Sequence, residues 1–575
     1  EALESPESDK RQGVCIGLSE IMSTAGKIQV IDYVDSIIPA VRKALVDESG
    51  EVREAAAQAF DTLQQHVGDK AIDEILPTLL NSLQSGEDST YALEALKEIM
   101  TVRANVVFPV LIPNLITVPI TTFNARALAS LVTVAGAALN KRLSNILNAL
   151  MESLSIETDD SVALELQETE RALLLSIDSS EGLQNLMTIL FEAVKNDEPA
   201  KRAGACDIVT IFCNETKMDF SKYTAEWIRV LVSLLDDHQI EVVKSAWNAL
   251  SAVTKSVKKD ELEQLVIPLR RSVKSVGVPG VDLPGFCLPK GISPILPIFS
   301  HGLMYGTADI REQSALGIGD LIQRTSADAL RPFVTQITGP LIRIIGDRYP
   351  PQVKAAILET LGILLTKVSA LLKPFLPQLQ RTFVKSLTDP TSALVRSRAA
   401  TALGTLISLQ TRVDPLILEL VTGIKTSEPS VRETMLSALE SVVNKAGNSM
   451  NESSKKGVLE VIANGRDSDL FSTSFWKSVQ AYSTPRSYAS HHAKNFNIYV
   501  NRTYVLTGEP TQSSLLAINA ILTEAPQIFF DLGIYNEIVN IVSIGSKSNQ
   551  PSIADNAVIA AGKINDLNNN QATEL

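Results

Sequence analysis

Hydrophobic positions recur along the chain in pairs of amphipathic segments, and a short acidic turn separates the two segments of a pair. The clearest pair covers residues 33–68. Its first segment is YVDSIIPAVRKALVD, and its second, ESGEVREAAAQAFDTLQQHVG, places Arg53 near its start and continues into Ala and Leu. Apolar residues spaced three and four apart lie on one side of a helix. We therefore predict a pair of antiparallel helices, with Pro39 inside the first and Asp47 capping the turn.

The same pair recurs, and the basic residue that opens the second helix marks each copy. Successive markers at Arg311, Lys354, Arg396 and Arg432 are 43, 42 and 36 residues apart. HEAT repeats have a period of roughly 40–47 residues, whereas ankyrin and tetratricopeptide repeats are shorter. Weaker copies place further markers at Arg126, Arg202 and Lys244. The fold class we predict is all-α, a HEAT-repeat α-solenoid.

A structural role explains the turn residues of the repeat. The aspartate can satisfy free amide groups at the start of the second helix. The basic marker can bond the aspartate in the adjacent repeat, and such pairs would form a ladder along the array. We therefore expect Arg53, Arg311, Lys354, Arg396 and Arg432 to stabilise the fold rather than to bind a partner.

The repeat pattern divides the chain into four parts. Residues 1–465 form the main array, 504–565 contain further HEAT-like repeats, and the polar end, 566–575, is expected to be disordered. Residues 466–503 have no apolar period, so we expect an irregular or disordered connector. Inside the array, residues 276–291 (VGVPGVDLPGFCLPKG) are too rich in Gly and Pro for a helix. This loop is either a binding element or a tolerated insertion.

Charge and composition restrict the function classes. The 575 residues carry a net charge of −13, which argues against a nucleic-acid binder with a wholly basic surface but leaves room for a local basic patch. The four cysteines have no paired spacing, which fits a reducing compartment. No apolar run is long enough for a membrane helix. The first residues resemble neither a signal peptide nor a natural start, so we expect a cytoplasmic protein and a fragment of a longer chain.

Catalytic and ligand-binding motifs are absent from the sequence. There is no glycine-rich phosphate loop, no G-x-S-x-G elbow and no H-E-x-x-H pair. The five histidines are scattered, and His491 and His492 are adjacent and so cannot face one site from a helix. We predict no catalytic residue, no metal ligand and no cofactor.

Several segments are more specific than a generic HEAT repeat. The strings PGFCLPKGISPILPIFSHGLMYGT, ITGPLIRIIGDR and LKPFLPQLQRTFVKSLTD resemble the family of the general-control translational activator, as do RQGVCIGLSEIM and the repeat that follows it. The resemblance covers nearly the whole chain to about residue 465 and returns after 503. It implies a ribosome-associated HEAT-repeat protein that helps to activate the starvation-responsive kinase of translation initiation factor 2 alpha. In this family the corresponding portion, here about 130–510, binds the RWD domain of the kinase.

The resemblance also implies one site residue. Kinase binding in the family depends on an arginine of the ITGPLIR segment, which is Arg343 here. From the residues alone, an arginine between apolar neighbours either extends to solvent or makes a buried ion pair. We also consider Arg348, Lys373 and Arg381 as an extension of a basic strip. The function expected is a non-catalytic scaffold that also reaches the ribosome through the larger protein, with other RWD-domain proteins as further partners.

Two alternatives remain open at this point. A nuclear transport receptor is also an acidic HEAT solenoid, but acidic loops would be expected there, and the loop at 276–291 is not acidic. A general HEAT scaffold would have a more regular repeat throughout.

Overall fold

Helices account for nearly all of the secondary structure in the computed structural model, which describes residues 2–85, 89–346, 349–410, 412–446, 449–451, 453–454, 456–458, 461, 510, 515, 518–519, 522–523 and 535–574. Within these residues there is no β-strand, as the sequence predicts for an all-α HEAT-repeat solenoid. No helix in the same part of the chain is long and apolar enough to span a bilayer. The chain divides into two units, Glu1–Lys259 and Asp260–Leu575.

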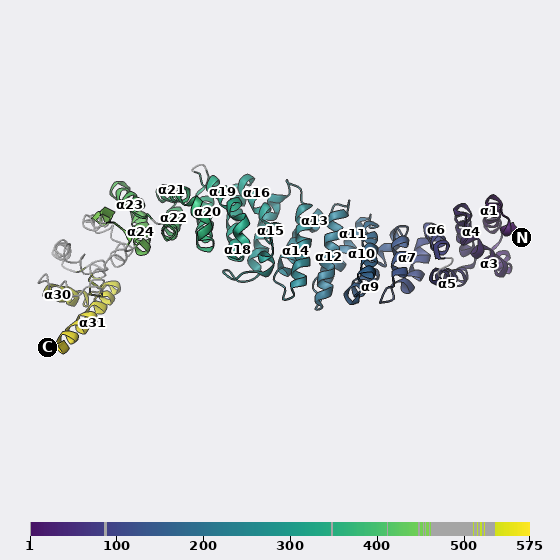
Figure 1. Ribbon diagram of the computed structural model, residues 1–575, viewed down its shortest axis with the longest axis horizontal. Coiled ribbons are helices and arrows are strands. Elements are labelled where there is room, and N and C mark those ends of the chain that lie inside the picture. Colours follow the sequence, from purple (N-terminus) through teal and green to yellow (C-terminus); the bar gives the residue numbers. More distant parts are fainter. Residues whose placement is uncertain are drawn as a thin grey trace. The chain divides into compact units, whose positions relative to one another are not determined.

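The helices of the first unit stand side by side in chain order (Figure 1). They are α1 (Ser8–Thr24), α2 (Lys27–Asp32), α3 (Val34–Leu45), α4 (Gly50–Val67), α5 (Asp69–Ser85), α6 (Ser89–Leu115), α7 (Thr122–Val132), α8 (Ala137–Asn140), α9 (Leu143–Ile156), α10 (Asp160–Leu175), α11 (Ser180–Ala193), α12 (Pro199–Glu215), α13 (Ser221–Leu234) and α14 (Ile240–Lys255), after a short 3₁₀ turn η1 (Ala2–Glu4). Arg103 inside α6 has non-helical backbone angles, so α6 comprises the second helix of one repeat and the first helix of the next.

The second unit continues the same alternation of first and second helices. Its elements are α15 (Leu262–Ser275), η2 (Pro284–Cys287), α16 (Leu296–Tyr305), α17 (Ala308–Gln323), α18 (Ala327–Leu330), η3 (Arg331–Phe333), α19 (Val334–Ile344), α20 (Pro351–Lys367), η4 (Ser369–Phe375), α21 (Leu376–Leu387), α22 (Ala393–Ile407), α23 (Asp414–Thr426), α24 (Pro429–Ala446), α30 (Tyr535–Gly545) and α31 (Pro551–Glu574). Second helices pack on second helices, as α20 does on α17 and α22, and first helices lie beside first helices, as α19 does beside α21.

Small side chains explain why the second helices approach closely. In α4, Ala55, Ala56, Ala57 and Ala59 are all buried, and Phe60 and Leu63 fill the space between α4 and its neighbours. Neither helix of a pair could bury its apolar side alone, so stacking of neighbouring pairs creates the core.

Contacts of the predicted ladder are present in both units. The arginines also make a second contact, to a backbone carbonyl, that the sequence did not suggest. Arg11 Nε donates to Asp47 Oδ2 at 2.8 Å, and Arg202 and Lys354 contact Asp237 and Asp389 at 2.9 Å. Each basic residue thus reaches the turn of the next repeat, 35 or 36 positions away. The arginines also donate to a carbonyl of their own turn, for example Arg396 Nη1 to the Asp389 carbonyl at 2.9 Å.

The ladder arginines of two repeats also contact a tyrosine. The Arg53 guanidinium lies over the ring of Tyr91 at 5.8 Å, and that of Arg311 lies over Tyr349 at 4.8 Å. An aromatic ring attracts a cation through its quadrupole, so each tyrosine adds a contact to its arginine. At Lys244 the structure differs from the predicted ladder, because this lysine pairs with Glu241 of its own helix.

The loop at 276–291 is ordered, and a buried arginine holds it. Arg324 is 2% exposed, and its guanidinium donates to the carbonyls of Val276 (2.9 Å), Asp320 (3.1 Å) and Lys274 (3.4 Å). The Leu283 amide in turn donates to the Arg324 carbonyl at 2.8 Å. The loop therefore belongs to the folded array rather than lying loosely on it.

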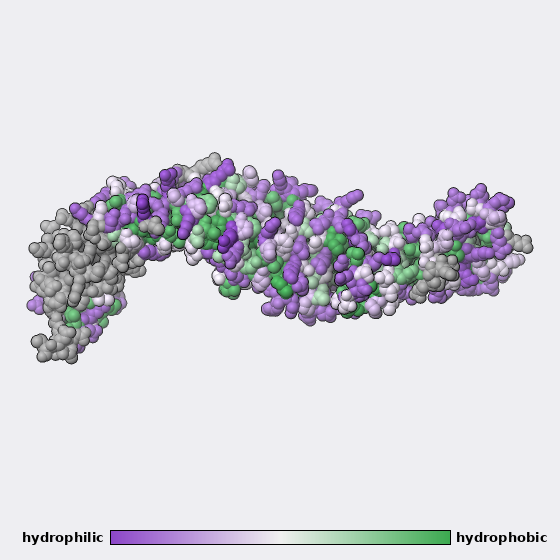
Figure 2. All heavy atoms as spheres, viewed as in Figure 1, coloured by the Kyte–Doolittle hydropathy of each residue, from purple (hydrophilic) through white to green (hydrophobic). Residues whose placement is uncertain are grey.

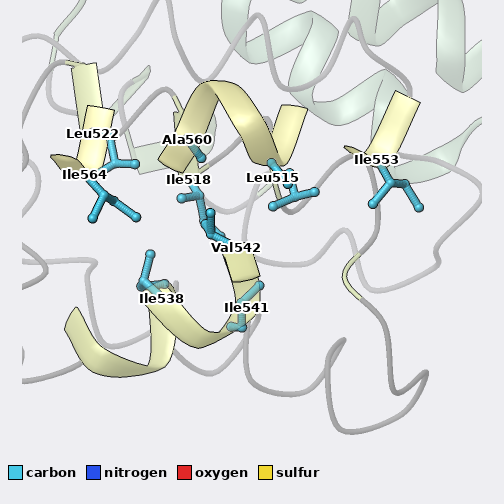
Figure 3. Close-up of a cluster of buried hydrophobic side chains, with 10 residues drawn as sticks. Leu515, Ile518, Leu522, Ile538, Ile541, Val542, Ile553, Ala560 and Ile564 are labelled. Carbon is cyan, nitrogen blue, oxygen red and sulfur yellow. The ribbon is translucent and has the colours of Figure 1, made fainter. Parts of the chain in front are cut away.

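The C-terminal helices form a separate hydrophobic cluster. Ile538, Ile541 and Val542 of α30 pack with Ile553, Ala557, Ala560 and Ile564 of α31 and with Leu515, Ile518 and Leu522 (Figure 3). Residues 466–503, where we expected a connector, lie outside the described residues. The structure differs from the expected disordered tail, because α31 continues to Glu574. A hydrogen bond of 2.5 Å from the Tyr535 hydroxyl to Asn568 Oδ1 ties this extension to α30.

Candidate partner-binding face

Arg343 lies in the last turn of α19, on the solvent side of a first helix. The buried side chains of α19 are Val334, Ile337, Thr338, Leu341 and Ile344, so the helix turns its other side outward. Arg343 is exposed, and among the described residues it has no ion pair or hydrogen bond through its side chain. Of the two possibilities that the sequence left open, a buried pair is therefore excluded.

The candidate neighbours of Arg343 fall into two groups. Lys373 in η4 and Arg381 in α21 are exposed, and neither has a carboxylate partner in the described part of the chain. Arg348 lies outside the described residues. The first helices α19 and α21 of consecutive repeats lie near each other (Figure 1) and are in contact. We therefore assign the exposed Arg343 and Arg381 to one face. We call the solvent side of α19, η4 and α21 the α19–α21 face.

The register of the repeat adds Lys385 to this face, a residue that the sequence analysis did not single out. Arg343 and Lys385 each stand four residues before the turn aspartate of their repeat, and Lys43 does so in the first unit. This spacing, with a basic residue four positions before the turn aspartate, is a signal in the sequence that could have identified Lys385.

Charge is distributed unevenly between the two units. Residues 1–259 contain 38 acidic and 23 basic residues, whereas residues 260–575 contain 27 acidic and 29 basic residues. The net negative charge of the chain therefore resides in the first unit. Hydrophilic side chains cover much of the visible face in Figure 2.

The segment that follows α19 carries an excess of positive charge. Residues 349–410 contain seven basic residues but only two acidic ones, Glu359 and Asp389. Arg398 lies 2.7 Å from Glu359, and Lys354 lies 2.9 Å from Asp389. Both carboxylates are thus paired with residues of the second helices, and neither pairs with Arg343, Lys373 or Arg381.

The Asp389 carboxylate remains ionised over the whole physiological range. Burial alone would raise the pKa of Asp389, but hydrogen bonds from Thr391 and Lys354 more than offset it and lower the pKa to about 2. The pairing of Asp389 with Lys354 therefore persists at neutral pH.

Chemistry other than binding has no support in the described residues. No group of three or more His, Cys, Asp or Glu side chains there could hold a metal ion. Burial raises the pKa of Cys15 to about 11 and that of Cys213 to about 12, so neither is a reactive thiolate near neutral pH.

Comparisons with known proteins assign the family. Residues 107–290 and 414–468 match two families that share the description "Stalled ribosome sensor GCN1-like, HEAT repeats". The Saccharomyces cerevisiae protein named eIF-2-alpha kinase activator GCN1 is 41% identical over 566 residues, which are 98% of this chain and 21% of that protein. The chain belongs to the GCN1-like family.

Further relatives agree with this assignment. The Mus musculus protein named Stalled ribosome sensor GCN1 is 43% identical over 477 residues, 82% of this chain and 18% of its own length. The chain thus spans about a fifth of the length of these GCN1 relatives. Residues 350–406 and 37–67 also match HEAT-like and HEAT repeats.

Among solved structures, importin beta in an ammonium sulfate condition superposes with a TM-score of 0.39 at 14% identity, covering 98% of this chain and 76% of that one. At this level of similarity the superposition says nothing about function.

Proposed function

We propose that this chain is a non-catalytic scaffold whose α19–α21 face binds the RWD domain of the initiation factor 2 alpha kinase. The larger protein would hold the scaffold on ribosomes in the cytoplasm and promote kinase activation during amino-acid starvation. The relatives named as kinase activator and stalled ribosome sensor support this role.

The observation that carries the proposal is the exposed guanidinium of Arg343, which has no ion pair among the described residues. A structural arginine in this array has partners, as Arg11 has in Asp47 and Arg202 has in Asp237. Arg343 has none among the described residues, so the array does not need its charge. A guanidinium that is free at the surface can bind a partner carboxylate through two parallel hydrogen bonds.

Binding alone would be enough for activation in this mechanism. A scaffold that holds the kinase beside the ribosome raises its local concentration there, which increases occupancy without any new chemistry. Arg348, Lys373 and Arg381 would extend the contact, and other RWD-domain proteins would compete for it.

The test is binding of a purified kinase RWD domain to this chain, with wild type, Arg343→Ala and Lys217→Ala compared. Lys217 is an exposed lysine of the first unit without a described partner, so its removal changes the net charge equally. We expect wild type and Lys217→Ala to bind alike, and Arg343→Ala to lose at least about tenfold in affinity. Circular dichroism of each variant checks that the helices remain.

Other results would contradict the proposal in different ways. Equal binding by wild type and both variants would mean that Arg343 does not contact the RWD domain and has a structural role instead. Absence of RWD binding by wild type, together with binding to a Ran-type GTPase, would favour the nuclear transport alternative.

A further inference from the structure

A glycine stands in the middle of α19 at a place where the fold does not use it. Gly339 is exposed, and a Cβ atom added there would meet no heavy atom within 4 Å outside its two chain neighbours and the adjoining backbone of its own helix. Its φ angle is in the ordinary range, so the backbone conformation does not require glycine either. Glycine inside a helix weakens it more than any residue except proline. The packing within the second unit therefore gives no reason for this residue.

Pro340 offers one local explanation, because a proline disfavours helical backbone in a preceding residue that has a Cβ. Other helices of the array have a proline in the same setting without a glycine before it. Ile38–Pro39 in α3, Leu76–Pro77 in α5 and Ile267–Pro268 in α15 each place a bulky residue before a proline inside the helix. A helical proline in this array thus tolerates a branched side chain before it, and Pro340 does not demand a glycine.

The position of Gly339 links it to the cations of the α19–α21 face. It precedes Arg343 by four residues, which places both on the same side of α19 one helical turn apart. In the register of the next repeat, 42 residues on, Arg343 corresponds to Lys385 and Gly339 corresponds to Arg381. First helices of neighbouring repeats lie roughly 8–10 Å apart. By this register, Arg343 lies one turn from Gly339 on α19, and Arg381 holds the position on α21 that corresponds to Gly339.

We propose that Gly339 marks the point at which an acidic segment of the partner comes closest to the backbone of α19, with partner carboxylates paired to Arg343 and Arg381. This inference rests on the proposed function and specifies its contact surface. Charge complementarity selects the partner's chemistry, because the two acidic side chains of 349–410 are already paired with Lys354 and Arg398. The partner is a folded acidic domain, and its docking site is the first-helix row.

The same repeat supplies a matched control on its other row. Gly362 lies inside α20, the second helix that follows α19, and a Cβ atom there would also meet nothing within 4 Å. A substitution at Gly362 changes a helical glycine in the same repeat without touching the α19–α21 face.

The experiment measures the affinity of the purified kinase RWD domain for the full chain carrying Gly339→Gln, Gly362→Gln or Arg343→Ala. Melting temperatures are recorded for these variants and for Gly339→Ala. We expect Gly339→Gln to weaken binding by at least about tenfold and Gly362→Gln to stay within about twofold of wild type. Gly339→Ala should raise the melting temperature, because alanine is the better helix former.

Each contrary outcome has a separate meaning. If Arg343→Ala weakens binding but Gly339→Gln does not, the proposed function stands and the close approach at Gly339 is wrong. Equal losses for Gly339→Gln and Gly362→Gln would overturn the choice of the first-helix row. A lower melting temperature for Gly339→Ala would show that the glycine serves folding, whatever the binding result. If wild type does not bind the RWD domain, the proposed function fails and this inference fails with it.

Discussion

The ammonium group of Lys354 lies 2.9 Å from a carboxylate oxygen of Asp389, and both side chains are almost completely buried. The pair joins the second helix of one repeat to the turn of the next. Because the folded state lowers the pKa of Asp389 to about 2, while an unfolded aspartate titrates near ~3.9, the carboxylate stabilises the fold above that unfolded value. The contribution is lost as the pH falls from about 4 to 2, and it amounts to ~2 kcal/mol.

Asp389→Asn should therefore lower the free energy of unfolding at pH 7 and flatten its dependence on pH in the acid range. Chemical denaturation at several pH values measures this. The exposed Asp328, which pairs with the exposed Arg331, provides the control. If Asp328→Asn had the same effect as Asp389→Asn, the ladder contact would contribute no more to the free energy of unfolding than an exposed ion pair does.

Removal of the buried guanidinium of Arg324 should release the loop at 276–291. Arg324→Met leaves the carbonyls of Val276 and Lys274 without their donor and should cost ~2–4 kcal/mol. Limited trypsin digestion should then cleave faster after Lys274 and Lys290. Unchanged cleavage with unchanged stability would mean that other contacts suffice to order the loop. Arg331→Ala should change neither quantity.

Glu170 predicts a pH dependence of the opposite sign. Its side chain is 3% exposed, and burial, reinforced by the charge of Asp207, raises its pKa to about 8. An unfolded glutamate titrates near ~4.3, so the folded state favours the protonated form. The stability associated with this proton is present below pH ~4.3 and is lost as the pH rises towards 8.

Glu170→Gln should thus stabilise the first unit by ~2–4 kcal/mol at pH 8–9 and have little effect at pH 4. Thermal melts across this range provide the measurement, with Glu168→Gln on the exposed side of α10 as the control. A Glu170→Gln variant that is destabilised at pH 9 would refute the burial of an uncompensated carboxylate.

Salt should weaken the proposed complex with the RWD domain. Exposed charges are screened over about 8 Å at physiological ionic strength, so affinity should fall as salt is added. Arg343→Ala should reduce the slope of this dependence, whereas Lys217→Ala should leave it unchanged. A complex whose affinity does not depend on salt would argue for an apolar contact instead.

The sequence predicted the fold class because the spacing of apolar and basic positions recurs from repeat to repeat, even where the residues themselves differ. The apolar positions of α3 and α4 and the marker at Arg53 recur often enough to fix both the helix pairs and their period. The ladder was predicted as a type of contact for the same reason, and Lys354–Asp389 confirms it.

The details that the sequence did not predict depend on contacts between distant residues. Tyr91 and Tyr349 contact the ladder arginines only because the fold brings each ring against the arginine of the preceding repeat. From the sequence, Arg324 cannot be distinguished from a surface arginine, because its burial depends on how the loop at 276–291 packs. The end of α31 was expected to be disordered from its polar composition, yet Tyr535 reaches it from another helix. Arg343 was proposed from the family resemblance, and its role remains a prediction.

In the described part of the chain, the ladder contacts join one repeat to the next, as expected for an array in which each repeat contacts its neighbours. The number of repeats is therefore not limited by the volume of a common interior. Insertion of a repeat would shift everything beyond it by one helix pair while leaving the other joints unchanged. Gain or loss of repeats would therefore change the distance between the α19–α21 face and any other binding site on the same polypeptide. The number of repeats would set that distance.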